Sequence, residues 1–579
     1  MANELAAEIV NQTKRGKSEH DRRVRRYDDS YRVWRGESAP SRVEPWQSKL
    51  RPKFGMQVID TAMVNIVSGK PHCVVRPRGP EHEQAAKAMQ SVLDYYVDED
   101  HLVEKLPVFV QSGLIFGPAI AKNHWLYREA MRPTRRKMTI NGGDVLVATK
   151  PEMIVQYDGP TFEPWDVYDA WWDPDARDVD SAAYIVLRSY VSKDDLLRLA
   201  RNEDANTGIY WNVPDLLKAG TVTEEAQRAQ YQSNSNDKRK DKFELWEVWR
   251  ETPQGLRLTV VGNGSVVLRD AVSPYWHGKK PIVVAQVRPD LFEIAGIPET
   301  ELVDHLQQAL WTVQNMRMDN LHLTVQRGIT YREGGVTDPN ALSLKPRFKW
   351  PVQDHDDIAF VAPTPLPPEA YQEEEALLSR MQLVTGINPY VSGSDMQGID
   401  QNTATGITAL QDVASRLLRF KAAQIQQKGL QRTYEQWSEM LQQFLDKDIA
   451  VRIEGPGKTY SWENYTPEDI IGSYDITLEG AEESLSRQQE RQEAIGLMNA
   501  IAPLAEMIDI RPVLERVAEA YNFPNPQALL KPLPQAQAAA PNGGTPPAPQ
   551  GPGQMLQNGN PVMPQGMAPG IQQAITEGQ

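Results

Sequence analysis

The sequence predicts an α+β protein that is mainly helical, and three observations support this fold class. Apolar residues recur at helical spacing near the N-terminus and again over long stretches such as 298–325 and 403–445. Between these stretches lie segments rich in aromatic and β-branched residues, and the pair Asn263-Gly264 between two of them indicates a hairpin turn. From about Pro532 the chain is dominated by Pro, Gln, Ala, Gly and Met, so we expect a disordered tail.

Length and composition restrict the class of protein. A chain of 579 residues is expected to form three or four modules, at roughly 100 to 200 residues for each domain. Its one cysteine, Cys73, excludes an internal disulfide framework and a zinc site of clustered thiolates, and suits a reducing cytoplasm. The segment Met1 to Lys17 lacks the apolar core of a signal peptide, and no stretch reaches the ~18 consecutive apolar residues of a membrane span. We therefore expect no association with a membrane.

The formal net charge of −15 argues against a simple nucleic-acid-binding protein, which neutralises phosphates with a basic surface. It leaves a DNA conduit open, because a passage through which DNA slides benefits from weakly repulsive walls. The charged N-terminal region is expected to form one or two amphipathic helices, ended by Gly36 and Pro40. It carries four arginines that could contact DNA, although a solvated face or a contact between subunits is favoured. These are Arg22, Arg23, Arg25 and Arg26.

The elements follow in a recognisable order. Helices are expected at 52–68, 81–98 and 101–116, and the strands that follow are Ala119–Arg128, Tyr184–Tyr190, Lys242–Glu251, Leu256–Val261 and Ser265–Arg269. A helix over 298–325 and a second over 368–385 could pair as antiparallel neighbours. A helix of about 43 residues, 403–445, with a kink near Gly429, is followed by strands at 449–454 and 474–479 and by helices over 482–522.

Candidate chemical motifs favour structural explanations. The run Gly455-Pro456-Gly457-Lys458-Thr459 lacks the first glycine of a phosphate-binding loop, because Arg452 occupies that position, so a turn between strands is favoured. No HExxH or GxSxG pattern occurs. Two acidic groups could surround calcium, but turn and capping chemistry is favoured. Four tryptophans in strand-like segments are expected to be buried in the core or at a subunit interface rather than to line a carbohydrate cleft. The acidic groups are Asp173, Asp175, Asp178 and Asp180, and Asp354 to Asp357 with His355; the tryptophans are Trp171, Trp172, Trp246 and Trp249.

Five segments in this order resemble the portal, or head-to-tail connector, proteins of tailed bacteriophages, especially the podovirus-like branch. They are DRRVRRYDDSYRVWRGE (21–37), IDTAMVNIVSGKPHCVVRP (59–77), GLIFGPAIAKNHW (113–125), WWDPDARDVDSAAY (171–184), and VTGINPYVSG followed by NTATGITALQDVASRLLRF (384–420). The similarity covers about residues 18 to 525. It implies a portal fold with wing, stem, clip and helical crown that assembles as a ring.

By position, the resemblance divides the chain into eight parts. These are the N-terminal α+β part of the wing (1–297), stem helix 1 (298–327), the clip (328–366), stem helix 2 (367–385), a channel loop (386–402), the long helix and strands of the wing (403–481), the crown (482–525) and the tail (526–579). Some relatives extend the crown into a helical barrel, which the proline-rich tail cannot form. Twelve stem helices spaced about 10 Å apart would leave a bore of roughly 28 Å, enough for duplex DNA to pass without being gripped.

The implied function is a non-enzymatic, dodecameric channel at the capsid vertex for genome packaging, retention and ejection, with no cofactor. The implied partners are further copies of the chain, double-stranded DNA, terminase, head-completion or tail adaptor proteins, and the major capsid and scaffolding proteins. The virion is the expected location, after assembly in the host cytoplasm. The clip residues expected to dock the motor or adaptor, or only to keep strand edges soluble, are Arg332, Lys345, Arg347 and Lys349, and the loop residues expected near DNA are Tyr390, Ser392, Asp395, Gln397, Asp400 and Gln401.

Two alternatives remain. Another structural protein of the phage head or tail would assemble with a different symmetry or without an axial hole. A polysaccharide-degrading enzyme, the weaker alternative, would use two facing carboxylates, and sequence does not exclude such a pair.

Overall fold

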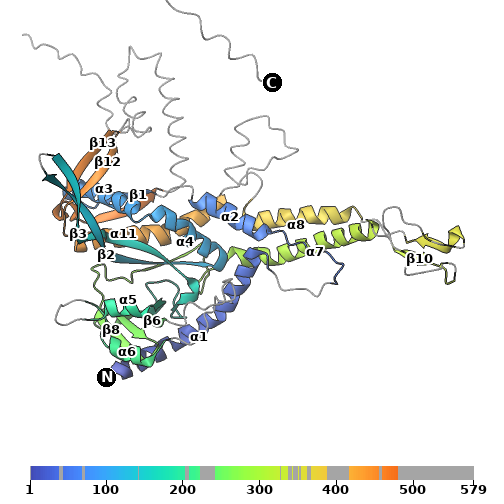
Figure 1. The fold of residues 1–579 in the computed structure, drawn as a ribbon, viewed down its shortest axis with the longest axis horizontal. Coiled ribbons are helices and arrows are strands. Elements are labelled where there is room, and N and C mark those ends of the chain that lie inside the picture. Colours follow the sequence, from blue (N-terminus) through green and yellow to red (C-terminus); the bar gives the residue numbers. More distant parts are fainter. Residues whose placement is uncertain are drawn as a thin grey trace, which may run out of the picture.

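The computed structural model describes residues 2–37, 44–67, 72–140, 143–201, 208–221, 242–325, 328–334, 336, 342, 350, 352, 354–361, 367–387, 416–455 and 459–479. It combines helices and strands, which confirms the predicted α+β class. A body of sheets and helices occupies one end, and a helical hairpin projects from it toward the other (Figure 1). Much of the helix predicted from sequence, at 403–415 and 482–522, lies outside the described residues.

One continuous helix, α1 (Ala2–Arg35), forms the N-terminus and ends at Gly36, which has a positive φ of 71°. Its first half lies against a five-stranded antiparallel sheet, where Ala6 and Ile9 are buried. The closest approach is at Gly16, where an added Cβ would lie 2.5 Å from the carbonyl oxygen of Trp172. A side chain at this position would push α1 off the sheet.

The sheet has the strand order β4-β5-β6-β7-β8, and its hairpins follow the chain. The turn of β7 and β8 is Asn263-Gly264, both with positive φ, which confirms the predicted hairpin. Side chains alternate between two buried faces, with Trp171 and Trp246 under α1 and Trp172 and Trp249 on the opposite face. The strands are β4 (Ala170–Trp172), β5 (Tyr184–Val191), β6 (Phe243–Thr252), β7 (Gly255–Gly262) and β8 (Val266–Val272), and helices α5 (Lys193–Leu199) and α6 (Val213–Ala219) contribute to the second face.

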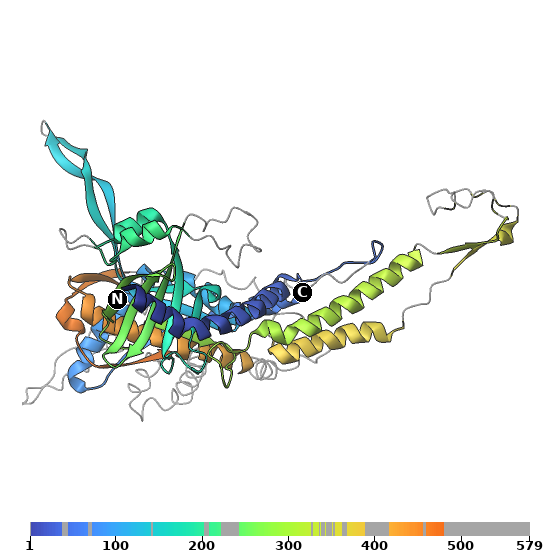
Figure 2. The ribbon, with the colours of Figure 1, turned by 90° about the horizontal axis from the view of Figure 1, so that it is seen from below.

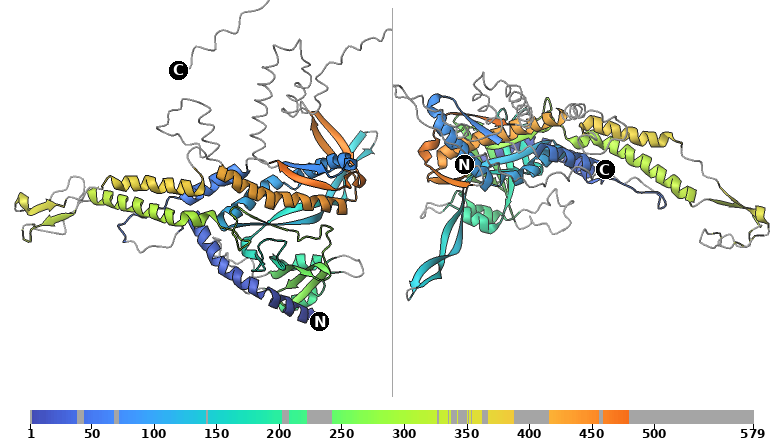
Figure 3. Two further views of the ribbon diagram at one scale, coloured as in Figure 1. Left: turned by 180° about the vertical axis from the view of Figure 1, so that it is seen from behind. Right: turned by 90° about the horizontal axis from the view of Figure 1, so that it is seen from above.

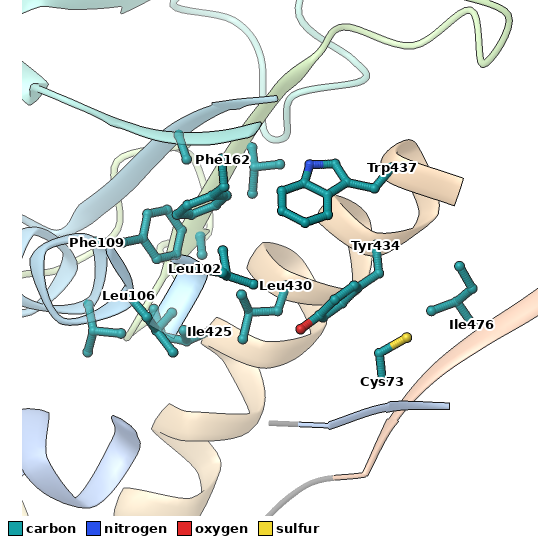
Figure 4. Close-up of a cluster of buried hydrophobic side chains, with 14 of the residues drawn as sticks. Cys73, Leu102, Leu106, Phe109, Phe162, Ile425, Leu430, Tyr434, Trp437 and Ile476 are labelled. Atoms are coloured by element: carbon teal, nitrogen blue, oxygen red, sulfur yellow. The ribbon is translucent and has the colours of Figure 1, made fainter. Parts of the chain in front are cut away.

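A second core joins the helices α2 (Phe54–Val67), α3 (Glu83–Glu99) and α4 (Leu102–Phe116) to the C-terminal half of the chain. Figure 4 shows Phe109 of α4 and Phe162 facing Leu430, Tyr434 and Trp437 across this core. Phe109 and Phe162 meet edge to face, with their ring centroids 5.2 Å apart. The core therefore links segments more than 250 residues apart in the sequence.

The long C-terminal helix is helical from Arg416 to Phe444, with a π-helical stretch (Gln426–Gln431) before α11 (Arg432–Phe444). The irregularity contains Gly429, where the sequence predicts a kink, and Gly429 lies against the Phe109 ring. The predicted start at 403 lies outside the described residues.

Strands β2 (Pro118–Ile140) and β3 (Gly143–Trp165) form a hairpin much longer than the predicted strand Ala119–Arg128. Its base pairs with β9 (Ile282–Gln286), and its outer part projects from the body (Figure 2). The sequence prediction ended too early because the outer residues are rich in Arg, Thr, Lys and Pro and face no core.

The remaining strands form short pairs. β1 (His72–Pro77) pairs with β14 (Tyr474–Glu479), and β12 (Ile449–Gly455) pairs with β13 (Thr459–Tyr465). Gly455 is opposite Thr459 in the second pair, which agrees with a turn between strands in place of a nucleotide site.

Candidate channel site: the stem hairpin, its base and the clip

Two antiparallel helices, which we call the stem hairpin, project from the body: α7 (Glu299–Val325) and α8 (Glu369–Thr385). The helices predicted at 298–325 and 368–385, and their pairing, are therefore confirmed. At 1.5 Å per residue α7 is about 40 Å long. Short strands β10 (Ile329–Tyr331) and β11 (Ile358–Phe360) pair at the far end of the hairpin.

The base of α7 is held by hydrogen bonds to α1, to the first turn of α2 and to the segment between them. Gln307 donates from Nε2 to the carbonyl of Val33 at 3.0 Å and accepts from the amide of Gly55 at 2.6 Å. The Trp311 indole donates to the carbonyl of Pro52 at 2.8 Å, and the Asn315 amide makes two hydrogen bonds with the backbone of Leu50, at 2.7 and 3.0 Å. These bonds fix the direction in which the stem hairpin leaves the body.

Polar contacts fix the register of the two stem helices. Glu374 of α8 accepts a hydrogen bond from Gln314 at 2.8 Å and forms an ion pair with Arg317 of α7. The Arg317 guanidinium also lies over the Tyr371 ring, 5.3 Å from its centroid. The middle of the hairpin is therefore joined by charge and stacking, with few buried apolar groups.

The outer half of the stem hairpin exposes apolar side chains. The last buried residue of α7 is Trp311. Beyond it four large apolar residues on α7 face solvent. They are Met316, Leu321, Leu323 and Val325, whereas the exposed Leu383 and Val384 of α8 lie at the inner end of the hairpin, next to Thr385.

The stem hairpin is also strongly acidic. Its two helices contain eight Asp and Glu residues and only two Arg or Lys residues, Arg317 and Arg380. Within the chain Glu299, Glu301, Glu373 and Glu374 pair with cations. Glu369, Glu373 and Glu375 of α8 are exposed. A wall built from such helices would repel the phosphates of DNA.

A buried ionic group joins the stem hairpin to the long helix. The Lys421 ammonium lies 2.9 Å from the carboxylate of Glu299 at the start of α7, and both side chains are at most 2% exposed. Lys421 also donates to the carbonyl of Thr385, the last residue of α8, at 2.8 Å, and Arg288 lies 3.6 Å from Glu299. Burial lowers the pKa of Lys421, and the Glu299 carboxylate opposes that shift.

This group was not anticipated from the sequence. The available signal was Lys421 itself, a cation within the predicted apolar side of a long helix. Its partner could not be identified, because Glu299 is 122 residues away and is indistinguishable in sequence from a first-turn residue of any helix.

In the clip region only Arg332 of the four predicted docking residues is described. Its guanidinium is mostly exposed and lies 3.2 Å from the carboxylate of buried Asp357. Asp357 also accepts from the amide of Asp354 at 2.9 Å, which confirms turn chemistry for that acidic group. Lys345, Arg347 and Lys349 lie outside the described residues, as do the predicted channel-loop residues Tyr390, Ser392, Asp395, Gln397, Asp400 and Gln401.

The other acidic group also fulfils the structural expectation. Asp173 accepts from the amide of Asp175 at 3.2 Å, and Asp178 accepts from that of Ser181 at 2.7 Å. Asp175 and Asp180 pair with Arg15 and Arg432, both at 2.6 Å. In the described residues no three His, Cys, Asp or Glu side chains are placed to hold a metal ion.

The N-terminal arginines are used in more ways than predicted. Arg26 pairs with Glu301 of α7 at 2.6 Å, and Arg22 pairs with Glu19 on its own helix. Arg23 is mostly buried and stacks over Trp172 at 4.6 Å, while Arg25 is exposed. Two of the four therefore make tertiary contacts within one subunit, a use that sequence analysis did not consider.

Comparison with known proteins identifies the family of this chain. The sequence model described as phage SU10 portal protein matches residues 145–560, more than half of the chain. The chain belongs to the SU10 portal protein family. It is therefore a phage portal protein, a structural component of the virion at the capsid vertex, and the family and function predicted from the sequence are confirmed.

Two solved structures that the portal protein is similar to come from gene transfer agent (GTA) particles. One is a chain in the neck of an empty GTA particle, at 10% identity, with a TM-score of 0.33 and coverage of 80% of this chain and 89% of the other. The second is in the virion of a native GTA particle, with the same identity and TM-score and coverage of 83% and 90%. No curated protein matches the chain. No helix in the described ranges has the length and apolarity to cross a membrane.

Proposed function

We propose that this portal protein assembles as a closed, dodecameric ring in which the stem hairpins stand side by side around an aperture for double-stranded DNA. The observation that carries the proposal is the stem hairpin itself, which leaves the body and exposes Met316, Leu321, Leu323 and Val325. A two-helix projection with so few buried residues gains stability when neighbouring copies cover its apolar side chains.

The charge of the stem hairpin supports a conduit rather than a DNA clamp. Eight acidic and two basic residues over its helices give each copy an excess of negative charge, which a ring would multiply around the aperture. A DNA clamp would instead present cations to the phosphates. DNA is thus expected to pass without sequence preference and without prolonged contact.

The domain division proposed for this subunit follows the predicted boundaries. The body comprises 1–297 and 403–481 as the wing, the stem comprises 298–327 and 367–385, and the clip is 328–366. The loop 386–402 begins directly after Thr385, whose carbonyl accepts from Lys421, so its origin is tied to the wing. A crown over 482–525 and a disordered tail over 526–579 complete the proposal.

The partners proposed for the ring are terminase and an adaptor at the clip, DNA in the aperture, and the capsid and scaffolding proteins around the wing. Terminase is proposed to supply ATP hydrolysis, so the subunit itself is proposed to be non-enzymatic and to need no cofactor. Assembly in the host cytoplasm is part of the same proposal.

The test is electron microscopy of the purified full-length chain, with an ATPase assay on the same sample. We expect rings of twelve subunits with a central hole, and no ATP hydrolysis without terminase. A stable monomer under assembly conditions, or an assembly without an axial hole, would contradict the ring and favour another head or tail role. Release of reducing sugar from polysaccharide, abolished by one carboxylate substitution, would instead favour the enzyme.

Two variants test the proposed sites. Deletion of residues 388–400 is expected to spare ring formation and to impair DNA packaging or retention. Replacement of Lys345, Arg347 and Lys349 by Glu is expected to weaken terminase or adaptor binding to intact rings, with Arg332→Lys as the charge-preserving control.

A further inference from the structure

The hairpin of β2 and β3 carries an arm, residues 128–157, that projects from the body of its own subunit. The arm rises from one broad face of the body, mostly along the shortest axis of the molecule (Figure 2). An isolated two-stranded ribbon is marginally stable in water. This arm is therefore expected to be covered by something outside the subunit.

One face of the arm is apolar. Met131 is opposite Met153 in the strand register, and Val155 lies two residues further along the same face. Tyr127 extends this stripe at the base of the arm and donates a hydrogen bond to Glu129 beside it. All four apolar side chains are exposed, Met131 at 67%. The strand register thus brings these side chains to the same face of the hairpin on both sides of the β-bulge between Arg128 and Glu129.

The arm is basic in a protein that is acidic. It contains six Arg and Lys residues against three Asp and Glu residues, whereas the whole chain carries −15. A second copy of this chain, which is acidic outside the arm, complements that charge.

The opposite broad face of the body has a feature that can receive the arm. The long helix lies on this face, as seen from behind and from above in Figure 3, with the arm on the far side. An open pocket of about 950 Å³ lies between α11 and the β1–β14 pair. Glu435 and Glu439 of α11 line it, and Trp276, 71% exposed, lies at its edge.

The lining of the pocket carries both signs of charge, with Arg76, Arg78 and Lys279 beside Glu435, Glu439 and Asp475. Arg432 pairs with Asp180 at 2.6 Å, Arg78 with Asp475 at 2.7 Å, and Lys447 with Asp158 at 3.3 Å. Trp276 offers an apolar surface to the methionines of the arm.

We propose that the arm of each subunit packs on the α11 pocket of the neighbouring copy, with Met131 and Met153 against Trp276. In a ring of identical subunits the front face of one copy meets the back face of the next, so the contact is heterologous and closes with the ring. The inference rests on the proposed ring and identifies the surface that joins its subunits.

Crosslinking in assembled rings tests the contact. The double variant Met153→Cys/Glu439→Cys is treated with a short bismaleimide and resolved on a denaturing gel. The one native thiol, Cys73, is buried, and burial raises its pKa to about 12, so its background reaction is low. We expect a ladder of covalent oligomers that ends at the number of subunits in the ring.

Three controls define the geometry. Rings made by mixing the two single-cysteine variants should give only covalent dimers, because each copy then has one reactive thiol. Met153→Cys/Glu375→Cys, with the second cysteine on α8 of the stem hairpin, should give no ladder. Met153→Cys alone should give no arm-to-arm dimer, and such a dimer would overturn the inference.

A second measurement does not depend on cysteine placement. The double variant Met131→Gln/Met153→Gln changes the two exposed methionines proposed to contact Trp276 and leaves the backbone of the hairpin intact. We expect an unchanged thermal midpoint of the monomer and at least a tenfold rise in the protein concentration needed for half-maximal ring assembly. Normal rings without a ladder and with unchanged assembly would overturn the arm contact alone, whereas wild-type protein that forms no ring would overturn the proposed function as well.

Discussion

The five-stranded sheet and the stem hairpin bury their apolar side chains to very different extents. The sheet covers both of its faces within one subunit, and Trp171, Trp172 and Trp249 are at most 2% exposed. The stem hairpin buries no residue of α7 beyond Trp311. The difference indicates that the body can fold as a monomer, whereas the outer stem depends on its neighbours.

The largest effect on subunit stability is expected in the body core. Trp437→Ala removes a fully buried indole between α11 and the β2–β3 hairpin and should lower the free energy of unfolding by about 4 kcal/mol. Urea denaturation followed by circular dichroism measures the loss. Trp462→Ala, at an exposed site on β13, is the matched control and should change stability by less than ~0.5 kcal/mol. Equal losses would contradict the contrast between core and surface.

The next largest loss of stability is expected at the junction between the stem hairpin and the long helix. Lys421→Met leaves the Glu299 carboxylate buried with only the more distant Arg288, and should cost about 3 kcal/mol in the same assay. The double variant Lys421→Met/Glu299→Leu removes both charges and should recover more than half of that loss. A single variant as stable as the wild type would show that the ion pair does not hold the stem hairpin to the long helix.

A pH-dependent effect of intermediate size is expected where α1 meets the body. His20 is buried, its Nε2 lies 3.1 Å from the carbonyl oxygen of Val167, and burial lowers its pKa to about 4. Because the folded pKa lies below the unfolded value of 6.5, the unfolded state takes up a proton first as the pH falls. Stability is therefore complete above pH 6.5 and declines toward pH 4, by about 2 kcal/mol at pH 5.

The measurement for His20 is the difference in unfolding free energy between wild type and His20→Gln at pH 7 and at pH 5. This difference cancels the titration of His124 and His277, whose pKa values are also lowered by burial. A gap that does not depend on pH would contradict the buried, neutral state of His20.

The smallest effect on subunit stability is expected in the outer stem. Leu321→Gln with Leu323→Gln should change the free energy of unfolding of the monomer by less than ~0.5 kcal/mol, because both side chains are about half exposed. The same variant should impair ring assembly, measured by analytical ultracentrifugation. Trp462→Gln, another exposed apolar site, is the control and should assemble normally. Destabilised monomers that still form normal rings would contradict the proposal that the outer stem depends on neighbouring copies.

Local patterns were sufficient for most elements but not for the arm or the junction. The helices at 298–325 and 368–385 were predicted because their periodicity is continuous, and Asn263-Gly264 identified its hairpin because only a few residues tolerate positive φ. The arm was missed beyond Arg128, because a strand that faces no core loses the apolar alternation by which strands are recognised. The predicted channel-loop residues stay a prediction.

The sequence by itself determined the α+β class, the order of elements and the portal family, because these depend on periodicity, turn chemistry and motifs that are local in the chain. Only the tertiary structure decided that Lys421 meets Glu299, that Arg23 stacks on Trp172, and that the arm and the α11 pocket occupy opposite faces. These contacts join residues more than 100 positions apart. Their partners are selected by packing in three dimensions, which leaves no periodic signal in the sequence.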